Sequence, residues 1–238
     1  MKAVIGIDAG HGGSSSGTYS VNTVSDGLFE KDYALELALL MEEHLKRNGF
    51  EVIMTRRTDE NPGNVSKRAE IVAEKGADFA LSIHFNGFEK ESANGTEIYV
   101  PYSETVAEIE AGFNNTLEKY FKKRLPFARS NSYFDRNKIF DKKLNLEKRR
   151  FDAKSTEKDY FGFVRGCWEK SVSADLIEIC FLTNKKDFET YLLNRKKIAE
   201  ELSENIVKAF GESFLKEEKT QEKPVIKPRI RRKFDLLN

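Results

Sequence analysis

The sequence predicts a three-layer α/β/α fold, in which helices cover both faces of a mostly parallel central sheet. Short apolar runs alternate along the chain with longer segments whose apolar residues recur every three or four positions. The runs are apolar throughout rather than at alternate positions, which is typical of strands that are buried on both faces. The first run ends in a glycine-rich segment, as expected where a strand opens into a loop. Strands that alternate with helices in this way favour a parallel sheet between two helical layers.

The first 100 residues contain the clearest elements of this pattern. An apolar run at 3–7 predicts the first strand, which opens into a loop of sequence Asp-Ala-Gly-His-Gly-Gly. Further strands are predicted at 50–55, 79–83 and 96–100, and a helix at 65–75. Another helix is predicted at 31–48, where a glycine provides a natural end and five apolar residues share one face: Ala34, Leu37, Ala38, Met41 and Leu45.

The rest of the chain combines further elements with two basic segments. A helix is predicted at 106–120, a buried strand at 174–181 and a long last helix at 188–210. An insertion at about 119–166 is rich in aromatic residues, and its first 32 residues include twelve basic and three acidic ones. The last 23 residues include eight basic and four acidic ones and show no periodicity. We therefore expect one folded domain at 1–212 and a flexible basic tail at 213–238.

Composition excludes several classes of protein. With 39% hydrophobic residues the chain can bury a core, so wholesale disorder is excluded. The 40 basic and 39 acidic residues leave a net charge of +1, which does not favour a specific nucleic-acid-binding protein. No apolar run approaches the roughly 20 residues of a membrane helix, and the first residues lack the apolar stretch of a secretory signal. The two cysteines, Cys167 and Cys180, are compatible with free thiols or with one disulfide.

Four side chains that could take part in metal chemistry are predicted to meet at one edge of the sheet. His11 follows the first strand, and His84 follows the third. Glu30 opens the first helix, and Glu178 lies near the end of the late strand. Ligands of open parallel sheets bind beyond the carboxyl ends of the strands, where these residues fall. Two imidazoles and a carboxylate suit Zn²⁺ with a fourth position left for water, and a further carboxylate could take a proton from that water.

Each of these residues also has a purely structural interpretation. A histidine after a strand is often a hydrogen-bonded loop residue, and Glu30 could be a first-turn carboxylate that interacts with the helix dipole. Glu178 could be a strand-end carboxylate that reaches solvent, although a carboxylate within an apolar run is costly unless it is paired or functional. The third histidine, His44, lies on a charged helix and is expected to be solvated. The spacing of the four candidates matches no compact metal-binding motif, so residue types alone leave a metal hydrolase and a structural role both open.

Six short segments spread over about residues 1–212 carry a family resemblance. They are Ile-Gly-Ile-Asp-Ala-Gly-His-Gly-Gly from position 5, Glu-Lys-Asp from 30, the pair Val-Ile-Met-Thr-Arg from 52 and Arg-Ala-Glu-Ile from 68, Ser-Ile-His-Phe-Asn from 82, and Glu-Ile-Cys-Phe-Leu-Thr-Asn from 178. Together and in this order they resemble the motifs of the zinc-dependent N-acetylmuramoyl-L-alanine amidases of the amidase_3 family. Each segment alone is weak evidence for the family, whereas the whole set in this order is specific.

The resemblance implies a role for each candidate residue. His11, Glu30 and His84 are the implied ligands of one zinc ion per chain, and Glu178 is the implied catalytic acid/base. The domain at 1–212 is then a catalytic domain that hydrolyses the amide between N-acetylmuramic acid and the L-alanine of peptidoglycan. The predicted partner is this peptidoglycan substrate, with no specific nucleic acid and no transmembrane segment.

The sequence departs from the family pattern at three places. Three serines at 14–16 replace an acidic residue, Cys180 replaces a glycine, and the insertion at about 119–166 is longer than the family leads us to expect. None of these changes removes a metal ligand or the acid/base. Two alternatives stay open: a zinc peptidase that acts on another stem-peptide bond, and a non-catalytic wall-binding or regulatory module on the same fold.

The expected place of action is the cell wall, in the periplasm or outside the cell. No signal peptide precedes the first strand in this chain. A phage endolysin released from the cytoplasm fits this combination, and so does a wall enzyme without its leader.

Overall fold

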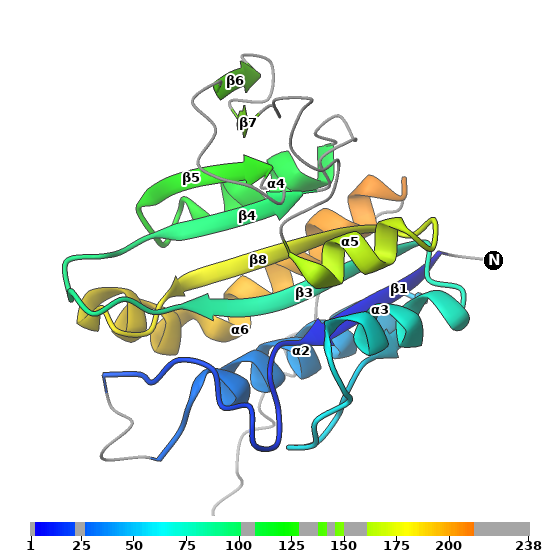
Figure 1. Cartoon of the computed structure of the whole chain (residues 1–238). Helices are drawn as coiled ribbons and strands as arrows, with labels where there is room; N and C mark the ends of the chain where they lie inside the picture. The colour runs from blue at the N-terminus through cyan, green and yellow to red at the C-terminus, as the bar shows by residue number, and fades with distance from the viewer. Residues whose placement is uncertain are drawn as a thin grey trace, which may run out of the picture.

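A six-stranded sheet lies at the centre of the molecule (Figure 1). The chain is described by a computed structural model that places residues 3–21, 27–100, 108–128, 138–141, 146–149 and 161–211. The strands of the sheet are β1 (Val4–Ala9), β2 (Glu51–Met54), β3 (Phe79–Asn86), β4 (Thr96–Val100), β5 (Lys123–Ala128) and β8 (Ser173–Phe181). Their spatial order is β2-β1-β3-β8-β4-β5, and all neighbours pair in parallel except β4 and β8, which are antiparallel.

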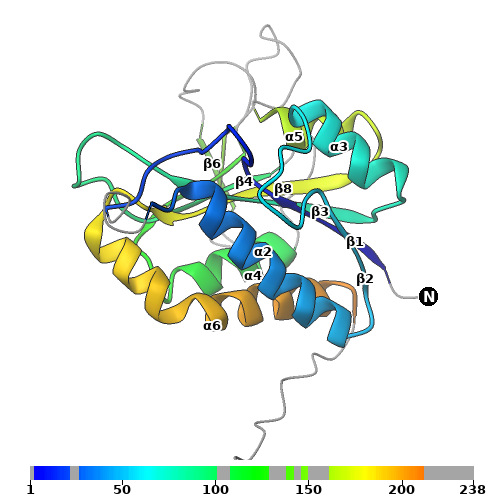
Figure 2. The same cartoon turned by 90° about the horizontal axis from the view of Figure 1, so that it is seen from below.

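Helices cover both faces of this sheet. Figure 2 shows α2 (Glu30–Arg47), α4 (Glu108–Leu117) and α6 (Lys185–Ala209) together on one face. The opposite face is covered by α3 (Val65–Glu74) and α5 (Gly162–Trp168). A separate two-stranded sheet is formed by β6 (Lys138–Asp141) and β7 (Leu146–Arg149). The predicted three-layer α/β/α architecture with a mostly parallel sheet is therefore confirmed.

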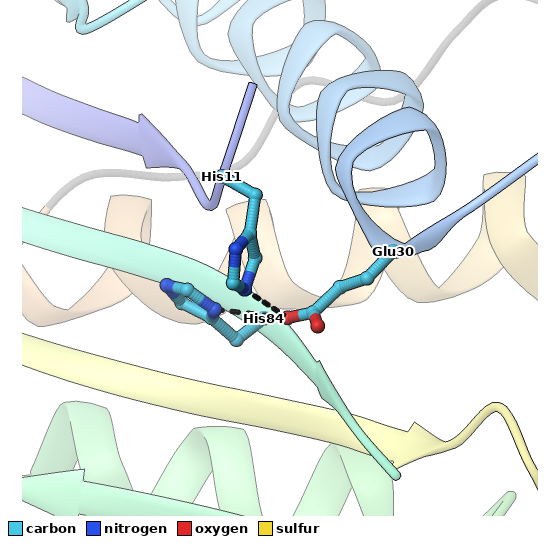
Figure 3. A group of neighbouring side chains, drawn as sticks. All are labelled: His11, Glu30 and His84. Atoms are coloured by element: carbon cyan, nitrogen blue, oxygen red, sulfur yellow. Dashed lines mark hydrogen bonds and ion pairs between the residues drawn. The ribbon is translucent and has the colours of Figure 1, made fainter. Parts of the chain in front are cut away.

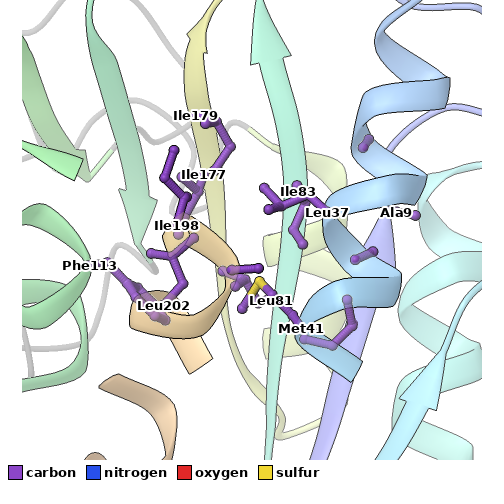
Figure 4. Packing of buried hydrophobic residues seen from close by; sticks show 14 of the residues in the cluster. Ala9, Leu37, Met41, Leu81, Ile83, Phe113, Ile177, Ile179, Ile198 and Leu202 are labelled. Atoms are coloured by element: carbon purple, nitrogen blue, oxygen red, sulfur yellow. The ribbon is translucent and has the colours of Figure 1, made fainter. Parts of the chain in front are cut away.

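The larger hydrophobic core lies between the sheet and the layer of α2, α4 and α6 (Figure 4). Leu81 and Ile83 of β3 pack there with Leu37 and Met41 of α2, and all four side chains are fully buried. Each such side chain stabilises the fold by about 1.5–3 kcal/mol. A smaller core, made mostly of alanines and valines with Ile53, Phe163 and Cys167, fills the space beneath α3 and α5.

Strand alternation decides which residues of the central strands belong to the large core. Odd-numbered residues of β3 point into it, so the even-numbered residues Ser82 and His84 lie on the face of α3 and α5. In β8 the residues Ile177 and Ile179 belong to the large core, which places Glu178 on the same face as His84. The polar residues of the central strands therefore gather on the side of the smaller core.

The predicted elements agree with the structure over most of the described residues, with two differences. The third strand extends to Asn86, so His84 lies within the strand rather than after it. The helix α5 and the strands β5, β6 and β7 were not predicted from the pattern. Much of the insertion at about 119–166 and the whole tail at 213–238 lie outside the described residues. Within the described part of the chain, Cys167 and Cys180 are separate buried thiols, and each helix is too short or too polar to span a bilayer.

Candidate metal centre

Three side chains from three different elements converge at the carboxyl end of the sheet (Figure 3). His11 comes from the loop after β1, Glu30 is the first residue of α2, and His84 lies in β3. One carboxylate oxygen, Glu30 Oε1, lies 3.1 Å from His11 Nε2 and 2.9 Å from His84 Nδ1. Taking one potential ligand atom from each residue, all three atoms lie within 4.8 Å of one another. This is the convergence that the sequence predicted for the two imidazoles and the carboxylate.

The carboxylate of Glu30 is held in place from both sides. Its Oε2 accepts a hydrogen bond of 2.9 Å from the backbone N–H of Thr18, and its Oε1 accepts one of 3.0 Å from the backbone N–H of Phe85. Burial alone would raise the pKa of Glu30, but hydrogen bonds from His11 and His84 outweigh burial and hold that pKa well below its usual range. The site therefore presents a fixed, ionised carboxylate, which a cation can bind.

The electrostatics of His84 mirror those of Glu30. Burial lowers the pKa of His84, whereas the hydrogen bond and the charge of Glu30 raise it, and the resulting pKa is about 9. The charge of Glu178 contributes to the same increase in the pKa of His84. Without an ion, the two residues thus form a buried pair of opposite charge, in which a proton occupies a place that a metal cation could take.

Two glycines give the site the room that it needs. A Cβ atom at Gly10 would lie 2.6 Å from Cε1 of the His84 ring, closer than real Cβ contacts come. A Cβ atom at Gly17 would lie 2.5 Å from Oε2 of Glu30, and Gly17 has a φ of +71°. The glycine-rich loop after β1 therefore serves close approach to the site as well as chain reversal.

The orientation of His11 is fixed by its second ring nitrogen. His11 Nδ1 lies 3.1 Å from the hydroxyl oxygen of Ser15, while Nε2 faces Glu30. Metal-binding histidines commonly use their other ring nitrogen for such a hydrogen bond, which sets the ring orientation and the tautomer.

Glu178, the predicted acid/base, lies beside this group. Its backbone is the register partner of His84 in the parallel pair of β3 and β8, and it is also the partner of Glu97 in the antiparallel pair of β4 and β8. Register partners on neighbouring strands project from the same face of a sheet, so the side chains of Glu178 and His84 are neighbours. The structure thus brings all four sequence-predicted residues to the carboxyl end of the sheet.

A cavity of about 530 Å³ adjoins the group on this face. His11 and His84 form part of its wall, and Leu176, Phe161 and Phe163 provide apolar surface. Asn61 and Asn64, which precede α3, provide polar groups. An apolar pocket with a few convergent polar groups has the character of a ligand-binding site.

Sequence reasoning missed some features of the site and misplaced one histidine. Asp8 is buried beneath the group and accepts hydrogen bonds from Thr55 and Ser82, and the pattern gave no role to it. An aspartate at the end of an otherwise apolar strand was the available signal. His44 was expected to be solvated, but it is only 8% exposed. It lies seven residues after Leu37, on the buried stripe of α2, so its helical position outweighs its charged neighbours.

Comparison with known proteins adds evidence that is independent of this geometry. A model of the Amidase_3 family, described as N-acetylmuramoyl-L-alanine amidase, matches residues 5–212. The chain belongs to the Amidase_3 family. All four candidate residues lie within the part of the chain that matches this family.

Two curated relatives are similar to this Amidase_3 chain over much of its length. N-acetylmuramoyl-L-alanine amidase AmiA of Escherichia coli (strain K12) is 26% identical over 231 residues, which cover 88% of this chain and 76% of that protein. A protein of Buchnera aphidicola that carries the name of an N-acetylmuramoyl-L-alanine amidase is 33% identical over 150 residues. That match covers 61% of this chain and spans 59% of the length of the Buchnera protein.

Solved structures support the fold of this Amidase_3 chain. The catalytic domain of CwlV, an N-acetylmuramoyl-L-alanine amidase from Bacillus (Paenibacillus) polymyxa var. colistinus, superimposes with a TM-score of 0.61 at 24% identity. That match covers 88% of this chain and 98% of the CwlV domain. AmiC2 of Nostoc punctiforme gives a TM-score of 0.64 at 22% identity and covers 89% and 98% of the two chains.

Proposed function

We propose that this chain is a zinc-dependent hydrolase that cleaves the amide bond between N-acetylmuramic acid and L-alanine in peptidoglycan. The observation that carries the proposal is the convergence of His11, Glu30 and His84 within 4.8 Å beside a cavity, in a chain of the Amidase_3 family. Its catalytic unit is the domain at 1–212, and its place of action is the cell wall. An endolysin and a cellular wall enzyme are both compatible with this chemistry.

The donor set suits zinc. Two imidazole nitrogens and one carboxylate oxygen are ligand types that Zn²⁺ prefers, and three protein ligands with an open position are typical of catalytic zinc sites. Zinc supplies Lewis acidity toward the scissile carbonyl and makes a bound water acidic near neutral pH. We assign one zinc ion per chain to His11, Glu30 and His84. The adjoining cavity leaves room for substrate beside these residues.

Glu178 is the proposed acid/base. Its carboxylate accepts a proton from the attacking water and returns that proton to the amide nitrogen of the departing L-alanine. Support for this role comes from its register position next to His84 and from its charge, which contributes to the raised pKa of His84. Because Glu178 belongs to β8 and no metal ligand does, removing its carboxylate should leave the metal ligands intact.

The proposal is tested by measuring zinc content and reaction products on one preparation of the full chain. We expect one zinc per chain, stem peptides that begin with a free L-alanine amine, and loss of this product after EDTA treatment. Re-addition of Zn²⁺ should restore product formation. If the protein binds zinc but cleaves another stem-peptide bond, its activity is that of a zinc peptidase and the amidase assignment is wrong. If it neither binds zinc nor cleaves peptidoglycan, a wall-binding module is favoured.

The role of Glu178 is tested separately with Glu178→Gln. We expect this variant to bind zinc with wild-type stoichiometry and to lose at least about 100-fold in turnover, since general acid–base catalysis contributes about 100- to 10,000-fold. Glu189→Gln, an exposed carboxylate of α6, is the matched control and should retain wild-type turnover. Near-normal turnover of Glu178→Gln would refute the assignment.

A further inference from the structure

Arg56, in the segment after β2, is a buried cation without a carboxylate partner among the described residues. Its side chain is only 2% exposed, and its guanidinium donates to backbone carbonyls. Nε donates to Ala9 O at 2.9 Å, and Nη2 donates to Gly10 O at 2.8 Å and to Lys31 O at 2.7 Å. A buried charge is costly unless it is fully hydrogen-bonded, so this arrangement calls for a reason.

The carbonyls that Arg56 contacts belong to the two segments that carry His11 and Glu30. Ala9 and Gly10 directly precede His11 in the loop after β1. Lys31 directly follows Glu30 in the first turn of α2. One rigid, planar guanidinium thus connects the loop that carries His11 to the helix start that carries Glu30. Lysine could not make these contacts together, because a single ammonium lacks the fork of donors.

A second buried arginine completes the support of the His11 loop. Arg68 of α3 donates through Nη2 to His11 O at 2.5 Å and through Nη1 to Ala9 O at 2.9 Å. Arg68 Nη1 also lies 2.9 Å from the buried carboxylate of Asp8. The three consecutive carbonyls of Ala9, Gly10 and His11 therefore all accept hydrogen bonds from guanidinium groups.

The conformation of the loop makes this support necessary. His11 has a φ of +59°, in the left-handed region that residues other than glycine rarely adopt. Such a conformation costs about 1–3 kcal/mol and persists only where the surroundings enforce it. Metal ligands must be held within about 0.5 Å of their productive positions. If the loop relaxed toward an ordinary φ, the imidazole of His11 would move away from Glu30.

We propose that Arg56 is a positioning residue of the metal centre, which holds the His11 loop against the start of α2 before any metal binds. Arg56 itself is neither a ligand nor a contact of substrate in this assignment. The proposal rests on the proposed function only in that the site binds zinc. It is independent of which bond the protein cleaves.

The same two segments are also joined on the outside, which provides a natural comparison. Lys31 Nζ lies 2.6 Å from Asp59 Oδ2 and donates to Gly13 O at 2.9 Å, and the backbone N–H of Gly13 donates to Asp59 Oδ1 at 2.9 Å. The side chain of Asp59 is 51% exposed. Exposed ion pairs contribute at most about 1 kcal/mol, so this outer link should matter far less than Arg56.

The test is a Zn²⁺ titration of the metal-free full chain by calorimetry. We expect Arg56→Lys to weaken zinc affinity by about 10- to 100-fold, the range found when groups that orient metal ligands are changed. Asp59→Asn should weaken it by less than about fivefold. Arg57→Lys is the matched control, because the neighbouring arginine is 49% exposed and pairs with Glu42 instead, and it should bind zinc like the wild type.

The outcomes separate the proposal from its alternatives. If Arg56→Lys folds and binds zinc with wild-type affinity, the positioning role is wrong. If the wild type itself does not bind zinc, the proposed function is wrong, whatever the variant does. A merely structural role would lower the free energy of unfolding in EDTA and leave the zinc affinity of the folded protein unchanged.

A second measurement on the wild type keeps the proposal falsifiable if Arg56→Lys does not fold. The backbone N–H groups of Gly10 and Gly12 donate to Ile83 O and Ser15 O at 3.0 and 2.8 Å. A loop held by Arg56 should protect these amides from hydrogen exchange in the metal-free protein as well as in the zinc-loaded one. Protection that appears only after zinc is added would show that the metal, rather than Arg56, orders the loop.

Discussion

The two faces of the central sheet are built from the same strands and have opposite chemistry. On the face of α2, α4 and α6, the residues Leu81 and Ile83 of β3 enter a continuous apolar core. On the face of α3 and α5, the residues Ser82 and His84, which alternate with them, meet Asp8 and the cavity. One face stabilises the fold by excluding water, and the other holds ionised groups in fixed positions.

The comparison shows that apolar burial on one face offsets the free-energy cost of burying ionised groups on the other. Desolvation of Glu30, His84 and Asp8 is unfavourable by itself, and the pKa of each reflects a balance of burial against partners. A sheet with both faces polar could not provide the apolar burial that offsets such costs. The functional groups also sit only at the carboxyl end, since Ala80 and Ala174 on the same face belong to the smaller apolar core.

The largest effect is expected from His84→Ala, on the polar face. Loss of one of three protein ligands should weaken zinc affinity by more than the roughly 100-fold that changes in outer groups can cause. In EDTA the variant should remain folded because both apolar cores are intact, but it should be less stable than the wild type because Glu30 loses its buried partner. Zinc content after dialysis and the free energy of unfolding in EDTA measure the two quantities separately. Wild-type zinc content in this variant would remove His84 from the ligand set.

The adjacent substitution, Ile83→Ala, should show the reverse pattern. Ile83 is fully buried in the large core, and truncating such a side chain costs about 2–5 kcal/mol of folding free energy. Zinc affinity of the folded variant should stay close to that of the wild type, because the side chain points away from the metal centre. Urea denaturation and zinc titration check the two expectations. A large loss of zinc affinity with little change in stability would contradict the division between the faces.

The sequence was sufficient to predict five of the six strands of the central sheet, the main helices and the four candidate residues, because apolar runs and strand ends have local signatures. It was insufficient for α5, which contains Gly162 and Gly166 and would be a poor helix on propensity alone. A Cβ at Gly166 would lie 2.8 Å from Cβ of Ala69, so close packing on α3 explains this glycine. Such tertiary reasons are invisible in a single sequence.

The supports of the site were hidden for a similar reason. Arg56 and Arg68 appear in the sequence as ordinary charged residues near the ends of predicted elements. Their importance lies in backbone carbonyl partners that are 25 to 59 positions away along the chain, as with Lys31 O for Arg56 and Ala9 O for Arg68. Side-chain ligands can be proposed from residue type, whereas backbone acceptors carry no residue-type signal.

The polar face should also give the metal-free protein a specific pH dependence. The pKa of His84 is raised to about 9 in the folded protein, from about 6.5 when unfolded. The resulting stabilisation is fully present below pH 6.5 and is lost as pH rises through 9. For Glu30 the folded pKa is lowered, so its contribution is present above about pH 4.5 and is lost on acidification. The free energy of unfolding in EDTA should therefore decrease between pH 6.5 and 9, and Glu30→Gln should flatten this decrease.

The smallest effect is expected from Ser82→Ala, which alters the polar face without touching a ligand. Ser82 Oγ donates to Asp8 Oδ2 at 2.6 Å, while Thr55 and Arg68 continue to bind Oδ1. Loss of one hydrogen bond to a buried carboxylate should cost about 1.5 kcal/mol of folding free energy at neutral pH, and zinc affinity should change little.

The pH dependence of stability in acid distinguishes an electrostatic role of the Ser82 hydroxyl from a simple packing role. Burial opposes ionisation of Asp8, but Arg68, Ser82 and Thr55 together hold the pKa of Asp8 below its usual value of 3.8. That stabilisation is present above pH 3.8 and disappears as the pH falls through the folded pKa. The difference in unfolding free energy between wild type and Ser82→Ala should therefore shrink in acid. A difference that stays constant with pH would assign the effect to lost packing volume, and the hydroxyls around Asp8 would then have no electrostatic role.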